Sequence, residues 1–357
     1  MLSLPTFCFA VETSAQSAIA IDLEYGNVLY EKNAHQRMSM ASTTKIMTAI
    51  CAIEEGDMDR KIKVHDSAVG VEGSSIYLTR GEELTLRELV CGLMLNSGND
   101  AAVAIAYAVS GSVEEFAQLM TQKAKQIGVQ NTQFKNPNGL DEEGHYTTAY
   151  DLARITAYAM KNEEFKKIAS TYQTTIPGPE GKRYLTNHNK LLKRMEGCTG
   201  VKTGFTKKSG RCLVSSCERD GVGVVCVTLN APDDWNDHMQ MTDYAYTKLK
   251  RKLVVNEGES FGDIKVEKGT AKTVAAVCRD SFWVPAADGV RYVSVYKRPE
   301  ALTAPVKEGD MVAKLEVYME NEHIATVPLV AANSVPEDNS RNLLKSIGSI
   351  AHRYLDI

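Results

Sequence analysis

Strand-like segments stand at both ends of residues 17–252, and helical patterns fill the stretch between them. The first two strands, at 17–22 and 28–31, flank Glu-Tyr-Gly-Asn, which is typical of a hairpin turn. Short extended pieces are predicted at 62–64 and 76–78. Apolar residues then recur at helical spacing in 84–95, 101–109, 112–128 and 148–161, before strands return at 172–176, 211–216 and 223–229. We therefore predict an α+β fold, in which one antiparallel sheet is covered by helices and residues 243–252 form a closing helix.

The pattern changes after residue 252. Short alternating strands, separated by Gly and charged turns, run from 254 to 328 and predict a small all-β domain at 253–333. Residues 334–357 are predicted to be a linker and an amphipathic helix, because apolar side chains recur at helical spacing from 343 to 357 opposite a partly basic face. Such a helix can lie in a membrane interface or pack on its own protein, and we expect the membrane contact.

The N-terminus indicates export. Residues 1–15 are mostly apolar and end in Thr-Ser-Ala, which resembles a cleavage site, so we predict the tail of a signal peptide. No Lys or Arg precedes Lys32, so the start of that peptide would lie upstream, and an ordinary disordered terminus is the alternative. The expected location is outside the cytoplasmic membrane.

Charge and cysteine usage exclude several classes of function. The formal net charge of -4 does not indicate the basic surface that binding of a nucleic acid requires. No apolar run reaches the roughly eighteen residues of a membrane-spanning helix. The eight cysteines have no Cys-x-x-Cys spacing, and four of them lie in apolar segments, where cysteine usually acts as a small buried side chain. We predict no metal, no cofactor and no specific disulfide.

The first chemical motif is Ser-Thr-Thr-Lys at residues 42–45, where an apolar helical run begins. Side chains three positions apart share one helix face, so the Lys45 amine can reach the Ser42 hydroxyl. A serine becomes a nucleophile when a neighbouring base takes its proton, and a neutral lysine can be that base. The Ser and Thr side chains are expected to cap the helix. A capped helix with an exposed lysine is the alternative, because Ser294 and Lys297 repeat the spacing inside a strand.

Two further motifs follow in order. Ser-Gly-Asn at 97–99 separates two helical patterns, and Lys-Thr-Gly at 202–204 precedes a strand. The ordered set resembles the signature of serine penicillin-recognising enzymes. Residues 18–250 resemble the low-molecular-mass penicillin-binding proteins that act as D-alanyl-D-alanine carboxypeptidases, in particular the branch found in spore-forming bacteria. Supporting stretches are residues 136–140, 145–153, 187–192 and 210–213.

The resemblance implies a β-lactamase/transpeptidase-like catalytic domain at 16–252 and assigns roles to the motif residues. Ser42 would attack the penultimate D-Ala carbonyl, with Lys45 as its base. The charge of Lys202 would help to keep Lys45 neutral. Ser97 would bridge the two lysines and relay a proton to the departing amine, and Asn99 would hydrogen-bond Lys45 and the substrate.

The same resemblance implies how the substrate is held. Thr203 would bind it at the strand edge, and Gly204 would let the strand approach closely. Backbone N–H groups of Ser42 and Phe205 would form the oxyanion hole. Peptidoglycan stem peptides would be the substrates, and β-lactams would be covalent inhibitors.

One departure from the family concerns the substrate's terminal carboxylate. Related proteins often hold it with an arginine after the strand that follows Lys-Thr-Gly, but residues 231–238 contain none. Lys202, Thr203 or Arg211 could substitute. His145 and His188 are not required by the family mechanism, and we expect both to be structural.

Three other functions stay open at this point. A peptidoglycan endopeptidase would use the same residues. A class A β-lactamase would need a water-activating glutamate, and no Glu-x-x-Leu-Asn lies between residues 99 and 202. A non-catalytic cell-wall-binding protein would be expected to lose the nucleophile or a lysine, and all are present.

Overall fold

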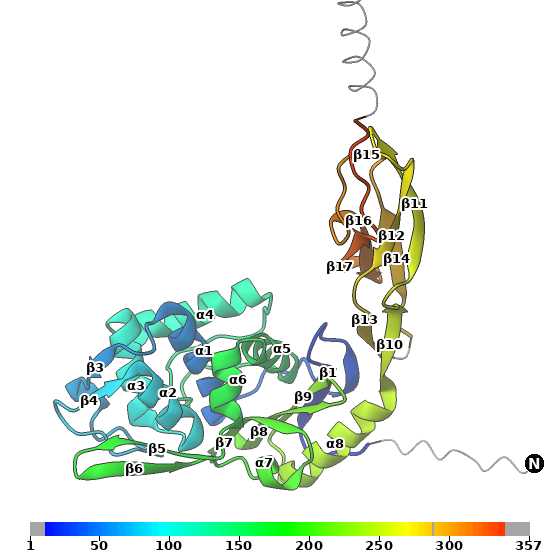
Figure 1. Ribbon diagram of the computed structural model, residues 1–357. Coiled ribbons are helices and arrows are strands. Elements are labelled where there is room, and N and C mark those ends of the chain that lie inside the picture. The colour runs from blue at the N-terminus through cyan, green and yellow to red at the C-terminus, as the bar shows by residue number, and fades with distance from the viewer. Residues whose placement is uncertain (1–10, 288, 340–357) are drawn as a thin grey trace, which may run out of the picture. The chain divides into compact units, whose positions relative to one another are not determined.

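The computed structural model describes residues 11–287 and 289–339, and the chain divides into two compact units after Leu249 (Figure 1). Within these described ranges no helix is long and apolar enough to cross a membrane. The predicted amphipathic helix and residues 1–10 lie outside the described residues.

The first unit is built on a five-stranded antiparallel sheet in the order β2-β1-β9-β8-β7. The strands are β1 (Ser17–Asp22), β2 (Val28–Lys32), β7 (Cys198–Thr206), β8 (Gly210–Arg219) and β9 (Val222–Leu229). β1 pairs with β9 along its whole length, so the two ends of this unit meet in the middle of the sheet. The predicted α+β architecture is confirmed, and β7 lies at one edge of the sheet.

Helices cover both faces of this sheet (Figure 1). Ile19 and Ile21 belong to the main core with α5, whereas Cys226 contacts Thr242 of α8 on the opposite face. The helices are α1 (Lys45–Glu55), α2 (Leu86–Leu95), α3 (Asn99–Ser110), α4 (Val113–Ile127), α5 (Ala149–Met160), α6 (Glu163–Ser170), α7 (Leu191–Arg194) and α8 (Asp234–Lys248). α1 lies inside the helical layer, with Ile46 to Ala52 all buried.

The closing helix was predicted too late in the chain. α8 begins at Asp234, not at 243, and residues 249–255 form strand β10 (Leu249–Val255) instead of continuing the helix. The acidic stretch before residue 238 places Asp234 and Asp237 in the first helical turn, where negative charge is favourable. One turn later, His238 is buried between the hydroxyls of Ser215 and Thr228 and fastens the helix to the sheet.

Residues 76–78 were expected to be extended but belong to no strand. The N–H groups of Ile76 and Leu78 donate to the Asp100 carboxylate, so a side chain takes the place of a neighbouring strand. Two small hairpins flank this loop: β3 (Lys61–Lys63) pairs with β4 (Glu83–Thr85), and β5 (Gln173–Gly178) pairs with β6 (Gly181–Thr186).

Residues next to the predicted cleavage point are folded. Thr13 and Ala15 are buried, and Ser14 bonds the Asp237 carboxylate through its backbone N–H at 2.9 Å and its hydroxyl at 2.6 Å. Cleavage after Ala15 would remove these contacts, and the predicted signal peptide stays a prediction.

Over its described residues the second unit is all-β, as predicted. Its main sheet has the order β14-β16-β17-β12-β11-β15, and β10 pairs separately with β13 (Phe282–Ala287). The main strands are β11 (Ser260–Glu267), β12 (Thr273–Cys278), β14 (Tyr292–Lys297), β15 (Ala301–Thr303), β16 (Met311–Met319) and β17 (Glu322–Ala331). The segment expected to be a linker continues this unit to residue 339, because Val335 is buried and pairs with Val306.

Candidate active site

Ser42 lies in a 3-10 turn, Ala41–Thr44, that leads directly into α1. The expected capping is wrong. The hydroxyls of Thr43 and Thr44 donate backwards, to the carbonyls of Met40 and Ala41, and no side chain caps either helix start. These bonds tighten the turn and leave the backbone N–H of Ser42 uncapped by any neighbouring side chain.

Lys45 is completely buried, and its amine has three oxygen neighbours. Nζ lies 2.9 Å from Ser42 Oγ, 2.7 Å from Asn99 Oδ1 and 2.6 Å from the Asn138 carbonyl. Burial lowers the pKa of Lys45 well below its ordinary value, and the charge of Lys202 lowers it further, against a smaller opposing effect of Asp100. A neutral amine keeps two N–H donors for Asn99 and Asn138 and turns its lone pair to the Ser42 hydroxyl.

The second motif sits in the sharp connection between α2 and α3. Ser97 has a left-handed backbone (φ 59°) and is buried at the cleft wall. Over the described ranges its hydroxyl has no hydrogen bond, so the predicted bridge between the two lysines is not formed in this state. Asn99 opens α3, and its amide oxygen accepts from Lys45 while its amide nitrogen donates to the Glu72 carbonyl at 2.5 Å.

The third motif lies on the edge strand β7. Lys202 is buried, burial lowers its pKa to about 7, and Nζ donates to the Thr203 carbonyl at 2.9 Å. Gly204 touches the Ser42 turn, because a Cβ added there would stand 3.0 Å from the Ser42 nitrogen and 3.1 Å from that of Thr43. Glycine therefore allows the strand to approach the turn this closely without displacing it.

The three motifs meet in one cleft of about 360 Å³. Ser42, Ser97, Thr203, Gly204 and Phe205 all line it. Lys45, Asn99 and Lys202 stand behind this surface, buried. The structure thus brings together all eight predicted site residues, five at the cleft surface and three beneath it.

The cleft wall also contains six residues outside the three motifs, of which Arg211 alone was considered from the sequence as a substrate-binding residue. These are Ser74, His188, Lys190, Arg211, Asp234 and Trp235. They come from the loop after β3, the turn before α7, β8 and the start of α8. Stretches 187–192 and 210–213 supported the family resemblance, but no pattern in them assigned His188 or Lys190 to the site. Ser74 reaches the cleft through its bond to Asn99, and the others reach it through the pairing of β8 with β7 and the packing of α7 and α8.

The two histidines differ. His145 is buried, with Nε2 2.8 Å from Thr44 Oγ1 and with Nδ1 accepting from the Lys135 N–H, and burial lowers its pKa to about 4. It is a neutral, structural residue behind the Ser42 turn. His188 instead lines the cleft, and burial and the charge of Lys202 lower its pKa. The structural role expected of His188 stays a prediction.

Arg211 is a cation held at the cleft. It pairs directly with Phe205 across β7 and β8, so its side chain shares a sheet face with Phe205 and Thr203. Its Nη2 donates to Asp234 Oδ1 at 2.8 Å, and the guanidinium carbon stands 5.7 Å from the centre of the Trp235 ring. The Asp234 side chain is 3% exposed but that of Arg211 is 42% exposed, so most of the guanidinium donors remain open.

Comparison with known proteins gives a consistent result. The family model described as D-alanyl-D-alanine carboxypeptidase matches residues 6–233, and that of the penicillin-binding protein 5 C-terminal domain matches residues 250–337. The chain is 34% identical over 343 residues to D-alanyl-D-alanine carboxypeptidase DacF of Bacillus subtilis, covering 93% of this chain and 88% of that protein.

Solved structures agree. The D-alanyl-D-alanine carboxypeptidase DacD from Francisella tularensis matches with a TM-score of 0.65 and 26% identity, covering 94% of this chain and 97% of that one. A peptidoglycan synthesis regulatory factor (PBP3) from Streptococcus pneumoniae, at 24% identity, shares the fold with a TM-score of 0.76 over 91% of this chain and 100% of that one.

Proposed function

Because the chain belongs to the D-alanyl-D-alanine carboxypeptidase family, we propose that it removes the terminal D-Ala from peptidoglycan stem pentapeptides through an acyl-enzyme on Ser42. The observation that carries this proposal is the contact of the Ser42 hydroxyl with a fully buried amine, that of Lys45, whose pKa burial lowers. A hydroxyl beside a neutral amine is an activated nucleophile.

In the acylation step, Ser42 Oγ bonds to the carbonyl carbon of the penultimate D-Ala, and its proton passes to Lys45. The bond to the terminal D-Ala nitrogen then breaks, and the proton passes through the Ser97 hydroxyl to the departing amine. Closure of the cleft on substrate would bring Ser97 into this relay, since catalytic hydrogen bonds often form only in the complex.

The tetrahedral oxyanion would be held by the backbone N–H groups of Ser42 and Phe205. The contact of Gly204 with the Ser42 turn supports this, because it holds the edge of β7 against the turn. Each such donor contributes about 3 kcal/mol to transition-state stabilisation. Thr203 would bind the substrate beside it.

Hydrolysis of the ester completes the cycle. A water attacks the acyl carbon, Lys45 takes its proton and returns it to Ser42 Oγ, and the shortened peptide leaves. A β-lactam would acylate Ser42 by opening of its ring. Its release is expected to be slow, because the chain has no glutamate in the class A β-lactamase pattern.

The substrate's terminal carboxylate would be bound by Arg211. Of the three groups considered from the sequence, Lys202 is buried and bonded to a carbonyl, and Thr203 carries no charge. Arg211 lines the cleft, keeps open donors and is oriented by Asp234. A guanidinium fork can bind a carboxylate through two parallel hydrogen bonds.

This function places the protein outside the cytoplasmic membrane, where peptidoglycan lies. Export through the N-terminal segment, membrane contact through residues 341–357 and a role in sporulation are parts of the proposal that rest on the sequence alone. Fractionation of cells that express the full chain or a version ending at residue 339 would test the membrane contact.

The function is tested by incubating the soluble protein with a pentapeptide ending in D-Ala-D-Ala and measuring free D-Ala, beside Ser42→Ala. We expect release by the wild type alone. If the wild type cleaves cross-linked dimers but releases no D-Ala from pentapeptide, the enzyme is an endopeptidase with the same residues.

A further inference from the structure

The loop of residues 72–82 forms one wall of the cleft and is tied to α3, the helix that carries Asn99. Ser74 of this loop lines the cleft, and its carbonyl accepts from the Asn99 N–H at 2.7 Å. The Glu72 carbonyl accepts from the Asn99 amide nitrogen. The loop therefore contacts Asn99 through both its backbone and its side chain.

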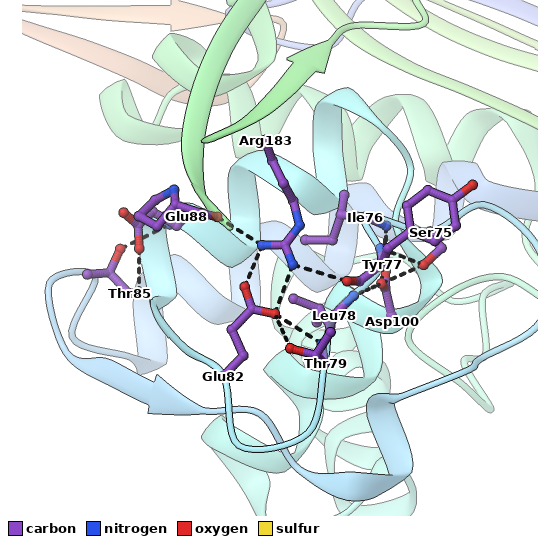
Figure 2. A network of polar contacts seen from close by, with 11 residues as sticks. Ser75, Ile76, Tyr77, Leu78, Thr79, Glu82, Thr85, Glu88, Asp100 and Arg183 are labelled. Atoms are coloured by element: carbon purple, nitrogen blue, oxygen red, sulfur yellow. Dashed lines mark hydrogen bonds and ion pairs between the residues drawn. The ribbon is translucent and has the colours of Figure 1, made fainter. Parts of the chain in front are cut away.

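The neighbouring Asp100 holds the next part of the loop (Figure 2). Its carboxylate accepts from the Ser75 hydroxyl at 2.6 Å and from the N–H groups of Ile76 and Leu78 at 3.1 and 3.0 Å. These bonds fasten the centre of the loop to the start of α3. They leave the outer part, residues 79–82, to be held by something else.

That outer part is held by Arg183, which reaches across from β6 (Figure 2). Its two terminal nitrogens donate to the two oxygens of Glu82 at 2.5 and 2.8 Å, and Nη2 also donates to the Tyr77 carbonyl at 3.1 Å. Both side chains of the ion pair are mostly buried, at 13% and 9% exposure. Burial raises the pKa of Glu82, but bonds from Arg183 and Thr79 outweigh it and hold that pKa below its usual value.

Tyr77 shows that the loop needs such a constraint. Its backbone is left-handed (φ 58°), which is unfavourable for a residue with a side chain, and the residue is 81% exposed, so side-chain packing does not hold this conformation. Hydrogen bonds to its backbone hold it instead: the Tyr77 N–H donates to Ser75 Oγ at 2.8 Å, and Arg183 donates to the Tyr77 carbonyl on the other side.

These contacts form a continuous path to the reacting serine. The Glu72 carbonyl can accept a hydrogen bond but cannot donate one, so it fixes the nitrogen side of the Asn99 amide and turns the oxygen side to Lys45. We propose that Arg183 is a positioning residue for catalysis: by clamping residues 77–82 it holds the loop that orients the Asn99 amide against Lys45. This inference rests on the proposed function for its kinetic consequence.

The test compares Arg183→Ala with wild type in two measurements. The first is the rate of Ser42 acylation by benzylpenicillin as a function of penicillin concentration, which separates binding from chemistry. The second is hydrogen exchange at the Ile76 and Leu78 amides, which reports opening of the loop without reference to activity. Lys182→Ala is the matched control, because it removes a cation from the same strand, and the Lys182 side chain has no ion pair or hydrogen bond within the described residues.

We expect Arg183→Ala to lower the limiting acylation rate by roughly tenfold with little change in the half-saturating concentration, since misplacing a catalytic group by about 1 Å can cost up to a hundredfold. The two amides should exchange faster. Arg183→Lys should be intermediate, because an ammonium cannot reproduce the two-pronged contact. Glu82→Ala should give the same defect, and the double variant should be no worse than either single one.

Gly73→Ala disturbs the contact between the loop and Asn99 while the Arg183–Glu82 ion pair stays intact. A methyl group there would stand 2.6 Å from the Asn99 amide nitrogen. It should lower the limiting acylation rate in the same way.

Several results would overturn the inference. One is wild-type acylation and wild-type amide exchange in Arg183→Ala. Another is a change in the half-saturating penicillin concentration with no change in the limiting acylation rate. A third is that the losses of acylation rate caused by Arg183→Ala and Glu82→Ala add up in the double variant. If wild type neither acylates nor releases D-Ala, the proposed function has failed. The exchange measurement then still decides whether Arg183 holds the loop, and unchanged exchange would reject the clamp.

Discussion

Replacing Arg211 by glutamine tests how the substrate's carboxylate is recognised. Glutamine removes the charge, yet its amide can still donate to Asp234, so the buried carboxylate keeps a partner. Hydrogen bonds to charged groups contribute about 1.5–3 kcal/mol, which corresponds to roughly tenfold to a hundredfold in kcat/KM. Because the Arg211 side chain is 42% exposed, solvent screening favours the lower half of that range.

The assay uses two substrates, an acylated D-Ala-D-Ala with a free carboxylate and the same peptide with a terminal amide. The wild type should prefer the free acid, and Arg211→Gln should lose most of that preference while its kcat/KM for the amide changes little. The matched control is Arg219→Gln. Arg219 lies on the same strand, is also paired with an acidic residue of α8 and also stacks on an aromatic ring of that helix, but lies outside the cleft lining.

Two results would refute the assignment. Equal losses on acid and amide would mean that Arg211 supports the structure of the cleft instead of binding the carboxylate. An unchanged preference would mean that another cation, such as Lys190 at the cleft wall, binds it.

Three further predictions concern pH and packing. Removing the cation at Lys202 by Lys202→Met should raise the pKa of Lys45, so the acid limb of the acylation rate moves to higher pH in stopped-flow measurements across pH. His145 has a folded pKa of about 4 against 6.5 unfolded, so it stabilises the fold above pH 6.5. About 3 kcal/mol should be lost as the pH falls through 4, seen in urea unfolding and absent in His145→Gln. Gly204→Ala should lower acylation by about a hundredfold, because the methyl group presses on two backbone nitrogens of the Ser42 turn, and a wild-type rate would contradict this contact.

The sequence predicted the scaffold well because it depends on local patterns. Strands at 17–22 and 223–229 are apolar on both faces, and their pairing follows once helices fill the space between them. The three motifs could be placed in one site because their order along the chain resembles the signature of a known family. The role of each motif residue remains a proposal that rests on the resemblance and the contacts.

The parts that could not be predicted depend on contacts between distant segments. The closing helix was predicted to begin at residue 243, and its earlier start at Asp234 follows from burial of His238 against β8 and β9. Residues 76–78 looked extended, but Asp100, more than twenty positions later, takes their N–H groups. No sequence pattern indicated a role for Arg183, because its partner Glu82 lies 101 positions away.

The central claim is that Ser42 is the nucleophile and Lys45 its base, and intact-protein mass measurement after exposure to benzylpenicillin tests it most directly. The wild type should gain one penicilloyl group on the peptide that contains Ser42, at a rate that rises with pH until Lys45 is neutral. Lys45→Arg and Ser42→Ala should gain no penicilloyl group in the time that labels the wild type, because an arginine cannot lose its proton and an alanine has no hydroxyl. A penicilloyl group on another residue, or rapid labelling of Lys45→Arg, would contradict the account.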